Sequence, residues 1–253
     1  MFLNSNGTSW RFCWELRQRE GLVINFADYQ AAGDVYKRVL FRGSVAQVHV
    51  PYFPGSPRFR DVTISTSGMG VGALNLTNTD CAPANRLTPQ VCREYHDRGL
   101  AWKFGNSSLR GQTVTVWISS QLGAYNYITS WTFNDDGSFE PKIGFTGHFQ
   151  IVNTGNEYAP FGTPVDAPVL IRYAINHVHS VYFRLDFDIV GFQSNAVDSL
   201  DYSTYTAPDP NFPNCANLPG LCGTNVANQI LTEGKDVLAS GAPFVSWRIY
   251  SLR

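Results

Sequence analysis

Two histidines separated by one residue, His177 and His179, lead into the most regular pattern of the sequence. Apolar and polar side chains alternate strictly from residue 183 to residue 189, which predicts a half-buried β-strand. The same parity puts both imidazoles on the apolar face, where they are unfavourable unless hydrogen-bonded or ligated. Imidazoles at positions i and i+2 of a strand can bind one metal ion. A pair of hydrogen-bonded core or edge residues is the alternative, because a stable transition-metal site usually has three or four protein ligands.

Length and composition fit a globular protein. The 253 residues suffice for one large β domain or two small ones, and 43% hydrophobic residues can fill a core. The formal net charge of −1 argues against a nucleic-acid binder or a polybasic membrane surface. We expect no membrane span, because no apolar stretch is long enough, and no signal peptide at this N-terminus.

The cysteines do not decide whether the protein folds in an oxidising or a reducing compartment. Cys81 and Cys92, like Cys215 and Cys222, have a spacing that suits a small disulfide loop, with Cys13 left over. Five reduced thiols are the alternative. Sequons at residues 6, 75 and 106 lean toward a secretory or extracellular ancestry.

Strand patterns run through the whole chain. Residues 21–26, 36–52, 113–118 and 244–250 read as strands, and the Asp-Gly step ending at Gly137 predicts a hairpin between residues 131–133 and Phe139. Residues 153–168 and 200–228, rich in Gly, Pro, Asn and Thr, read as long loops. We find no internal repeat and no long helix. The sequence therefore predicts an all-β fold, a large β-sandwich.

Several segments, in order, resemble one known family. They are Trp10 to Phe12 with residues 19–24; residues 39–52, where the family typically has Leu-Tyr-Arg-Ala-Ser-Leu-Ala-Glu-Met-x-Val-Pro-Tyr; residues 99–103; residues 123–127 with Thr146 and Gly147; and residues 177–188. Together they are similar to the catalytic domain of copper amine oxidases, the topaquinone-containing primary amine oxidases.

The resemblance implies a fold, an activity and cofactors. The fold would be the family's β supersandwich, with residues 1–253 as a single catalytic-like domain, incomplete at its C-terminus and without the family's small N-terminal domains. The activity would be oxidative deamination of primary amines to aldehydes, with release of ammonia and hydrogen peroxide. The cofactors would be copper and topaquinone, with calcium at a peripheral site.

The same resemblance assigns roles to individual residues. Tyr125 would be the topaquinone precursor, Tyr127 the second tyrosine of that motif, and Tyr52 the tyrosine that hydrogen-bonds the cofactor. His177 and His179 would be copper ligands. The carboxylates of a calcium-type site would be Asp186 and Asp188, on the strand face opposite the histidines. Ordinary sheet aromatics and solvated acids are the alternative interpretation of the tyrosines and aspartates.

The sequence also departs from the family. The segment from Thr66 to Gly72 lacks the carboxylate that serves as base, and Asp61 is the nearest substitute. Ala124 and Asn126 replace the asparagine and the acid that flank the quinone tyrosine. The third copper histidine has no match, although residues 49, 96 and 148 are histidines.

Two functions therefore compete. The first is a primary amine oxidase, active or degenerate. The second is a pseudoenzyme, or a cofactor-independent protein that uses the old amine pocket for another small molecule, for example in a biosynthetic pathway. The partner would be a small molecule in either case, and the chain could pair as a homodimer.

Overall fold

The computed structural model describes residues 2–3, 6–52, 58–63, 68–149, 151–153, 156–165, 172–189, 195–204, 223–229 and 245–251. Contacts divide the chain into two compact units, Met1–Asp186 and Phe187–Arg253, and each is described by itself. The expectation of a single domain stays a prediction.

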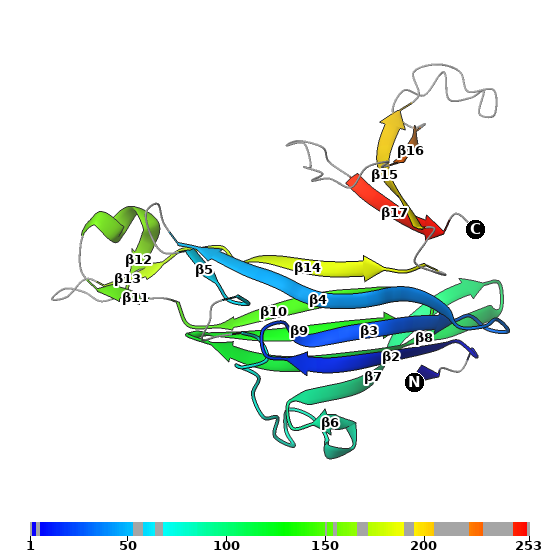
Figure 1. The fold of residues 1–253 in the computed structure, drawn as a ribbon, viewed down its shortest axis with the longest axis horizontal. Coiled ribbons are helices and arrows are strands. Elements are labelled where there is room, and N and C mark those ends of the chain that lie inside the picture. The colour runs from blue at the N-terminus through cyan, green and yellow to red at the C-terminus, as the bar shows by residue number, and fades with distance from the viewer. Residues whose placement is uncertain are drawn as a thin grey trace. The chain divides into compact units, whose positions relative to one another are not determined.

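The first unit contains two large sheets (Figure 1). One has the strand order β1-β2-β3-β4-β14, with β5 paired to β4. Its strands are β1 (Phe2–Leu3), β2 (Ser9–Arg17), β3 (Gly21–Gln30), β4 (Lys37–Pro51), β5 (Arg58–Arg60) and β14 (Ser180–Phe187). The other has the order β10-β9-β8-β7-β6. Its strands are β6 (Arg86–Thr88), β7 (Val91–Phe104), β8 (Ser107–Leu122), β9 (Tyr125–Asn134) and β10 (Phe139–Gly147).

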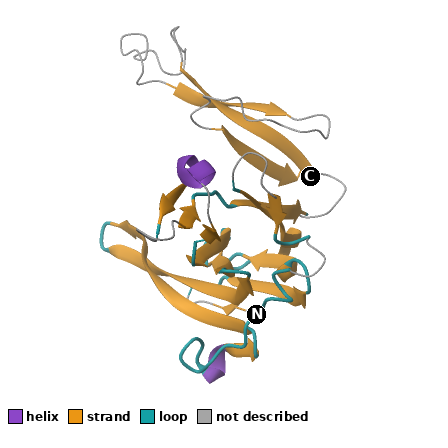
Figure 2. Cartoon of the chain, turned by 90° about the vertical axis from the view of Figure 1, so that its left-hand side faces the viewer, coloured by secondary structure: helices purple, strands orange, loops and turns teal. Residues whose placement is uncertain are grey.

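The described part of this unit also contains a small third sheet and two short helices. The sheet has the order β11-β13-β12. Its strands are β11 (Ile151–Asn153), β12 (Gly162–Pro164) and β13 (Arg172–Ile175), and the 3-10 helices are η1 (Pro83–Asn85) and η2 (Asn156–Phe161). Strands make up most of the part of the chain that the structure describes (Figure 2). The predicted all-β fold is confirmed.

The two large sheets pack face to face as a sandwich. Along β9 from residue 127 onward, odd-numbered residues are buried and even-numbered ones are more exposed, as the period of a strand requires. The fully buried Trp131 lies with its ring centroid 6.0 Å from that of Phe183 on β14. Trp10 of β2 packs in the same way on Phe133 of β9, with centroids 5.0 Å apart. Aromatic side chains of both sheets therefore contact one another within a core that also contains many aliphatic residues.

Local patterns predicted the strands better than the loops. Residue 133 pairs with Phe139, and Gly137 has a φ of 89°, so the predicted hairpin is confirmed. The predicted loop at 153–168 is wrong in part, because η2 and β12 lie within it. A segment rich in Gly, Pro and Asn can still pair when a partner strand, here β13, is supplied from elsewhere in the chain.

The second unit contains one sheet with the order β16-β15-β17. Its strands are β15 (Asn195–Thr204), β16 (Gly223–Gln229) and β17 (Val245–Ser251). The predicted final strand is confirmed as β17. The predicted loop at 200–228 is wrong at both ends, since Leu200 pairs with Ala227.

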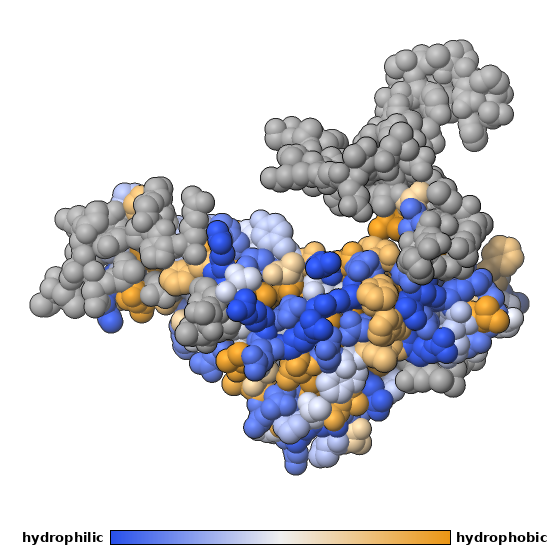
Figure 3. All heavy atoms as spheres, in the orientation of Figure 1, coloured by the Kyte–Doolittle hydropathy of each residue, from blue (hydrophilic) through white to orange (hydrophobic). Residues whose placement is uncertain are grey.

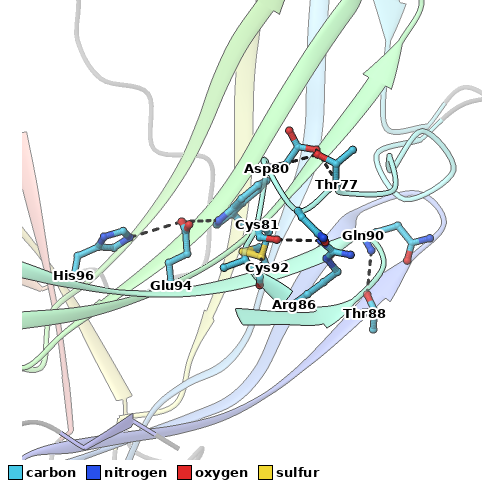
Figure 4. Close-up of a disulfide and its surroundings, with 12 residues drawn as sticks. Thr77, Asp80, Cys81, Arg86, Thr88, Gln90, Cys92, Glu94 and His96 are labelled. Carbon is cyan, nitrogen blue, oxygen red and sulfur yellow. Dashed lines mark hydrogen bonds and ion pairs between the residues drawn. A yellow bond between two sulfur atoms is a disulfide. The ribbon is translucent and has the colours of Figure 1, made fainter. Parts of the chain in front are cut away.

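One disulfide joins the turn before η1 to the start of β7. Cys81 and Cys92 are both buried and are bonded to each other (Figure 4). The guanidinium of Arg86 donates to the Cys81 carbonyl oxygen at 3.0 Å, which braces the closed loop. Cys13 is free and exposed. One predicted disulfide is thus confirmed, and Cys215 and Cys222 lie outside the described residues.

Hydrophilic and hydrophobic residues are interspersed on the face drawn in Figure 3. This mixture is expected where strands expose alternate side chains to water. Among the described residues, no helix has the length and apolar composition needed to cross a membrane.

The approach of the two sheets depends on a glycine. A Cβ added to Gly43 of β4 would lie 2.4 Å from Cη2 of Trp131 on β9. The segment that this strand resembles has an alanine here, so the glycine leaves room for the indole.

We predict that Gly43→Ala destabilises the first unit by about 1–3 kcal/mol, because the methyl group overpacks a filled core. Equilibrium unfolding in urea would measure this change.

Gly144→Ala on β10 is the matched control. Its Cβ would meet Ile128 at an ordinary 3.7 Å, so its stability should equal or slightly exceed that of the wild type. Equal stabilities of the two variants would contradict the steric argument.

Candidate functional site

Strand β9 positions two of the predicted tyrosines. The turn between β8 and β9 contains Gly123, with a φ of 59°, and Tyr125 is the first residue of the strand. Tyr127 lies two residues later on the same face and is fully buried. Val45, Val48 and other apolar side chains surround it, and Tyr125 packs at the edge of this cluster.

The two histidines precede β14. They lie between β13 and β14 instead of inside the predicted strand, but the alternation is kept: Val178 is 65% exposed, and both imidazoles are partly buried. His177 Nδ1 is 2.8 Å from the Ile175 carbonyl oxygen. A carbonyl only accepts, so Nδ1 carries the hydrogen and Nε2 of this ring carries a lone pair.

Tyr52 follows the last residue of β4, and its side chain contacts His177 and Tyr125. Its ring stacks on His177 with centroids 4.3 Å apart, and its hydroxyl is 3.2 Å from the Tyr125 hydroxyl. The Tyr125 ring meets His177 and His179 edge to face, at 5.4 and 4.8 Å. The structure therefore brings together the three tyrosines and two histidines that the sequence singled out.

A hydrogen-bond chain continues behind these rings. The Tyr127 hydroxyl lies 3.1 Å from His179 Nδ1 and also donates to the Asp61 carboxylate. The two imidazoles face each other through Nε2, 2.9 Å apart. Hydrogen bonds thus link Asp61, Tyr127 and His179 on one side and His177 with the Ile175 carbonyl on the other, and the two imidazoles meet at their Nε2 atoms.

A cleft of about 300 Å³ opens in front of the histidines. Its lining residues are Tyr125, Phe145, Thr146, Gly147, His148, Phe149, His177 and His179. Gly147, with a φ of 135°, allows the end of β10 to approach β9, since a Cβ there would lie 2.4 Å from the Ala124 carbonyl oxygen. The cleft is aromatic, and no carboxylate is among these lining residues.

Burial sets the electrostatics of the site. Burial, with repulsion from His177, lowers the pKa of His179 to about 4, so this imidazole is neutral near neutral pH. Burial also raises the pKa values of Tyr52 and Tyr127 far above the ordinary range, so both phenols keep their protons. Burial raises the pKa of Asp61 as well, although the hydrogen bond from Tyr127 opposes this shift.

Other predicted residues lie elsewhere. Asp186 is exposed on β14, while Asp188 is buried, and the calcium-type site stays a prediction. Thr66 lies outside the described residues.

Of the three spare histidines, residue 148 lines the cleft, whereas residues 49 and 96 do not. No group of three His, Cys, Asp or Glu side chains converges on one point in the described ranges. A third side chain therefore does not converge on His177 and His179 in the described ranges, and His148 is the nearest of the three by its place in the cleft.

The sequence did not reveal the hydrogen-bond partner of Asp61, nor that Phe145 and Phe149 line the cleft. Asp61 is the nearest substitute for the missing base by sequence, yet it does not line the cleft and its carboxylate is bonded to Tyr127. Phe145 and Phe149 follow the predicted hairpin, and only the observed pairing of β10 with β9 brings Phe145 opposite Tyr127.

Comparison with known proteins identifies the class. The family model "copper amine oxidase, enzyme domain" matches residues 88–233. Primary amine oxidase 2 of Arabidopsis thaliana is 27% identical over 81% of this chain and 36% of its own length. The primary amine oxidase of Klebsiella aerogenes is 25% identical over 76% of the chain and 29% of its own length. The chain belongs to the copper amine oxidase family and spans about a third of these relatives.

A solved structure supports the fold. The copper-containing benzylamine oxidase from Hansenula polymorpha superposes with a TM-score of 0.75 at 19% identity, over 95% of this chain and 40% of its own. The supersandwich fold expected from the sequence is confirmed.

The low pKa of His179 predicts a pH dependence of stability in the copper-free protein. An unfolded chain takes up a proton near the ordinary value of 6.5, whereas the folded chain resists it down to about pH 4. The free energy of unfolding should therefore fall between pH 6.5 and 4, by on the order of 2 kcal/mol after allowance for partial exposure. Urea unfolding at a series of pH values would measure this slope.

His179→Gln should lose that slope, whereas His96→Gln, which changes an exposed histidine, should keep it. An unchanged slope in His179→Gln would assign the effect to another group.

Proposed function

We propose that this chain is a copper-binding amine oxidase domain that acts on primary amines. His177 and His179 would hold the copper ion, and Tyr125 would be the tyrosine that is oxidised to the quinone. The observation that carries the proposal is the convergence of Tyr125 on both imidazoles, at centroid distances of 5.4 and 4.8 Å, with its hydroxyl 3.2 Å from that of Tyr52.

The two imidazoles fit a copper ion. Two nitrogens bound side by side to one tetragonal metal ion at ~2.0 Å are about 2.9 Å apart. The Nε2 atoms of His177 and His179 are separated by 2.9 Å. Both rings have their other nitrogen occupied by a hydrogen bond, as metal-binding histidines usually do. The remaining coordination positions would need donors other than these two side chains.

The surrounding residues suit the handling of a small amine. A quinone at residue 125 supplies an electron sink for amine oxidation. The Tyr52 hydroxyl would orient its oxygen, while Phe145 and Phe149 would exclude water and contact the substrate. An ammonium group can also be attracted to such aromatic faces.

The second candidate is small-molecule binding without amine oxidation. It is favoured by the lining of the cleft, where none of the described residues has a carboxylate to remove a proton from the substrate. Loss of a general base typically reduces the rate by ~10² to 10⁴. Ala124 beside Tyr125 points the same way, since it supplies no side-chain amide to restrain the ring. A homodimer and a bound calcium ion stay predictions in both cases.

The two functions predict different states of Tyr125. If the oxidase proposal is right, aerobic incubation with Cu(II) should oxidise this tyrosine, which adds oxygen and removes hydrogen. Peptide mass spectrometry would locate the change, and a visible absorption band with peroxide release from a primary amine would accompany it.

Tyr125→Phe and His177→Ala are the controls, and both should abolish the mass change and the band. Tyr182→Phe, on an exposed position of β14, should retain them. Copper-replete wild-type protein with an unmodified Tyr125 would exclude the oxidase and leave small-molecule binding.

A further inference from the structure

We infer that Asp61 is a positioning residue for copper binding. Acting through the Tyr127 hydroxyl, its carboxylate holds His179 in the tautomer whose Nε2 is free to bind the metal. The inference rests on the proposed copper site and adds a residue with no place in the motifs that carry the family resemblance.

One end of the hydrogen-bond chain is fixed by the backbone. The Ile175 carbonyl accepts from His177 Nδ1 at 2.8 Å, so Nε2 of His177 presents its lone pair. To bind the same metal ion, His179 must also present a lone pair on its Nε2 atom. That ring must then carry its hydrogen on Nδ1, which faces the Tyr127 hydroxyl at 3.1 Å.

The hydroxyl by itself does not choose a tautomer, because a phenol can donate or accept. Tyr127 has one hydrogen, and the neighbouring carboxylate of Asp61 can only accept it. The phenol oxygen is then left to accept from His179 Nδ1. A neutral group in place of the carboxylate could donate to Tyr127, which would reverse the chain and put the hydrogen on Nε2.

The carboxylate is held rigidly enough for this role. The backbone N–H of Asp61 donates to the Val48 carbonyl of β4 at 3.0 Å. The next N–H, of Val62, donates to the Gln47 side chain at 3.1 Å. Tyr127 is fully buried, so water does not compete for its hydroxyl. The turn and the strand therefore fix both members of the pair.

The arrangement also prepares the site for a cation. With both tautomers set, two lone pairs face each other across 2.9 Å and repel. A positive ion bound by both nitrogens removes the repulsion, and the distant carboxylate stabilises its charge.

Copper affinity tests the inference in the full-length protein. We expect Asp61→Asn and Tyr127→Phe each to weaken Cu(II) binding about 10- to 100-fold in competition with a chelator. The double variant should bind no more weakly than Tyr127→Phe, because Asp61 acts through that hydroxyl. Tyr29→Phe removes another hydrogen-bonded tyrosine hydroxyl, away from the histidines, and should leave the affinity unchanged.

The tautomer of His179 provides a second measurement, which non-specific destabilisation of the fold would not change. In zinc-loaded protein, long-range ¹H–¹⁵N spectra should show His179 protonated on Nδ1. In the metal-free Asp61→Asn variant the hydrogen should shift toward Nε2. Tyr127→Phe keeps the ring that fills the core, so it tests the inference even if Asp61→Asn folds poorly.

The outcomes separate this inference from the proposed function. A folded wild type that binds no Cu(II) would refute the copper site. A wild type that binds Cu(II) and loses it in His177→Ala, but keeps wild-type affinity and tautomer in Asp61→Asn and Tyr127→Phe, would overturn the role of Asp61 alone.

Discussion

The hydrogen bond between Tyr127 and His179 is the interaction on which the site depends. It joins β9 of one sheet to the segment that enters β14 of the other, at a point where Tyr127 is fully buried and His179 is partly buried. A buried phenol or imidazole without a partner is costly, so each residue constrains the other. Because Tyr125 lies two residues before Tyr127 on the same face, this one contact also brings its ring against both imidazoles.

Small residues let the surrounding elements come close enough for that bond to form. Gly43 allows β4 to pack on the Trp131 indole, and β4 in turn delivers Tyr52 at its end. Gly147 allows the end of β10 to pass over the Ala124 carbonyl, which closes one wall of the cleft. The absence of a side chain at Gly43 and Gly147, which lie outside the hydrogen-bond chain, therefore helps to determine where the aromatic rings of the site lie.

The sequence predicted what local rules decide and missed what long-range contacts decide. The strand β14 and the turn at Gly137 could be predicted, because the alternation of apolar and polar residues and the need for a positive φ are local properties of the sequence. Strand β15 was not predicted, and its second half was assigned to a loop, since Asn and Asp are depleted in strands and this segment pairs because its partners supply hydrogen bonds. The contact of Asp61 with Tyr127 spans 66 positions, and no spacing rule reports it. The convergence of tyrosines and histidines was expected through the family resemblance, not through periodicity.

The residues that match the family's motifs and the residues that depart from them belong to different steps of the proposed chemistry. Copper binding and oxidation of Tyr125 require the imidazoles, the tyrosines and their supports, and all of these are bonded to one another in the structure. Turnover of an amine also requires a proton acceptor in the cleft and a restraint on the quinone ring. No carboxylate is among the described residues that line the cleft, and Ala124 has no side-chain amide to restrain the ring. Because the first set does not depend on the second, the oxidase proposal treats formation of the cofactor and catalysis with it as separate steps. Under the oxidase proposal, copper binding therefore depends on residues that are present and mutually in contact, whereas amine turnover depends on an acid that is absent from the described lining of the cleft.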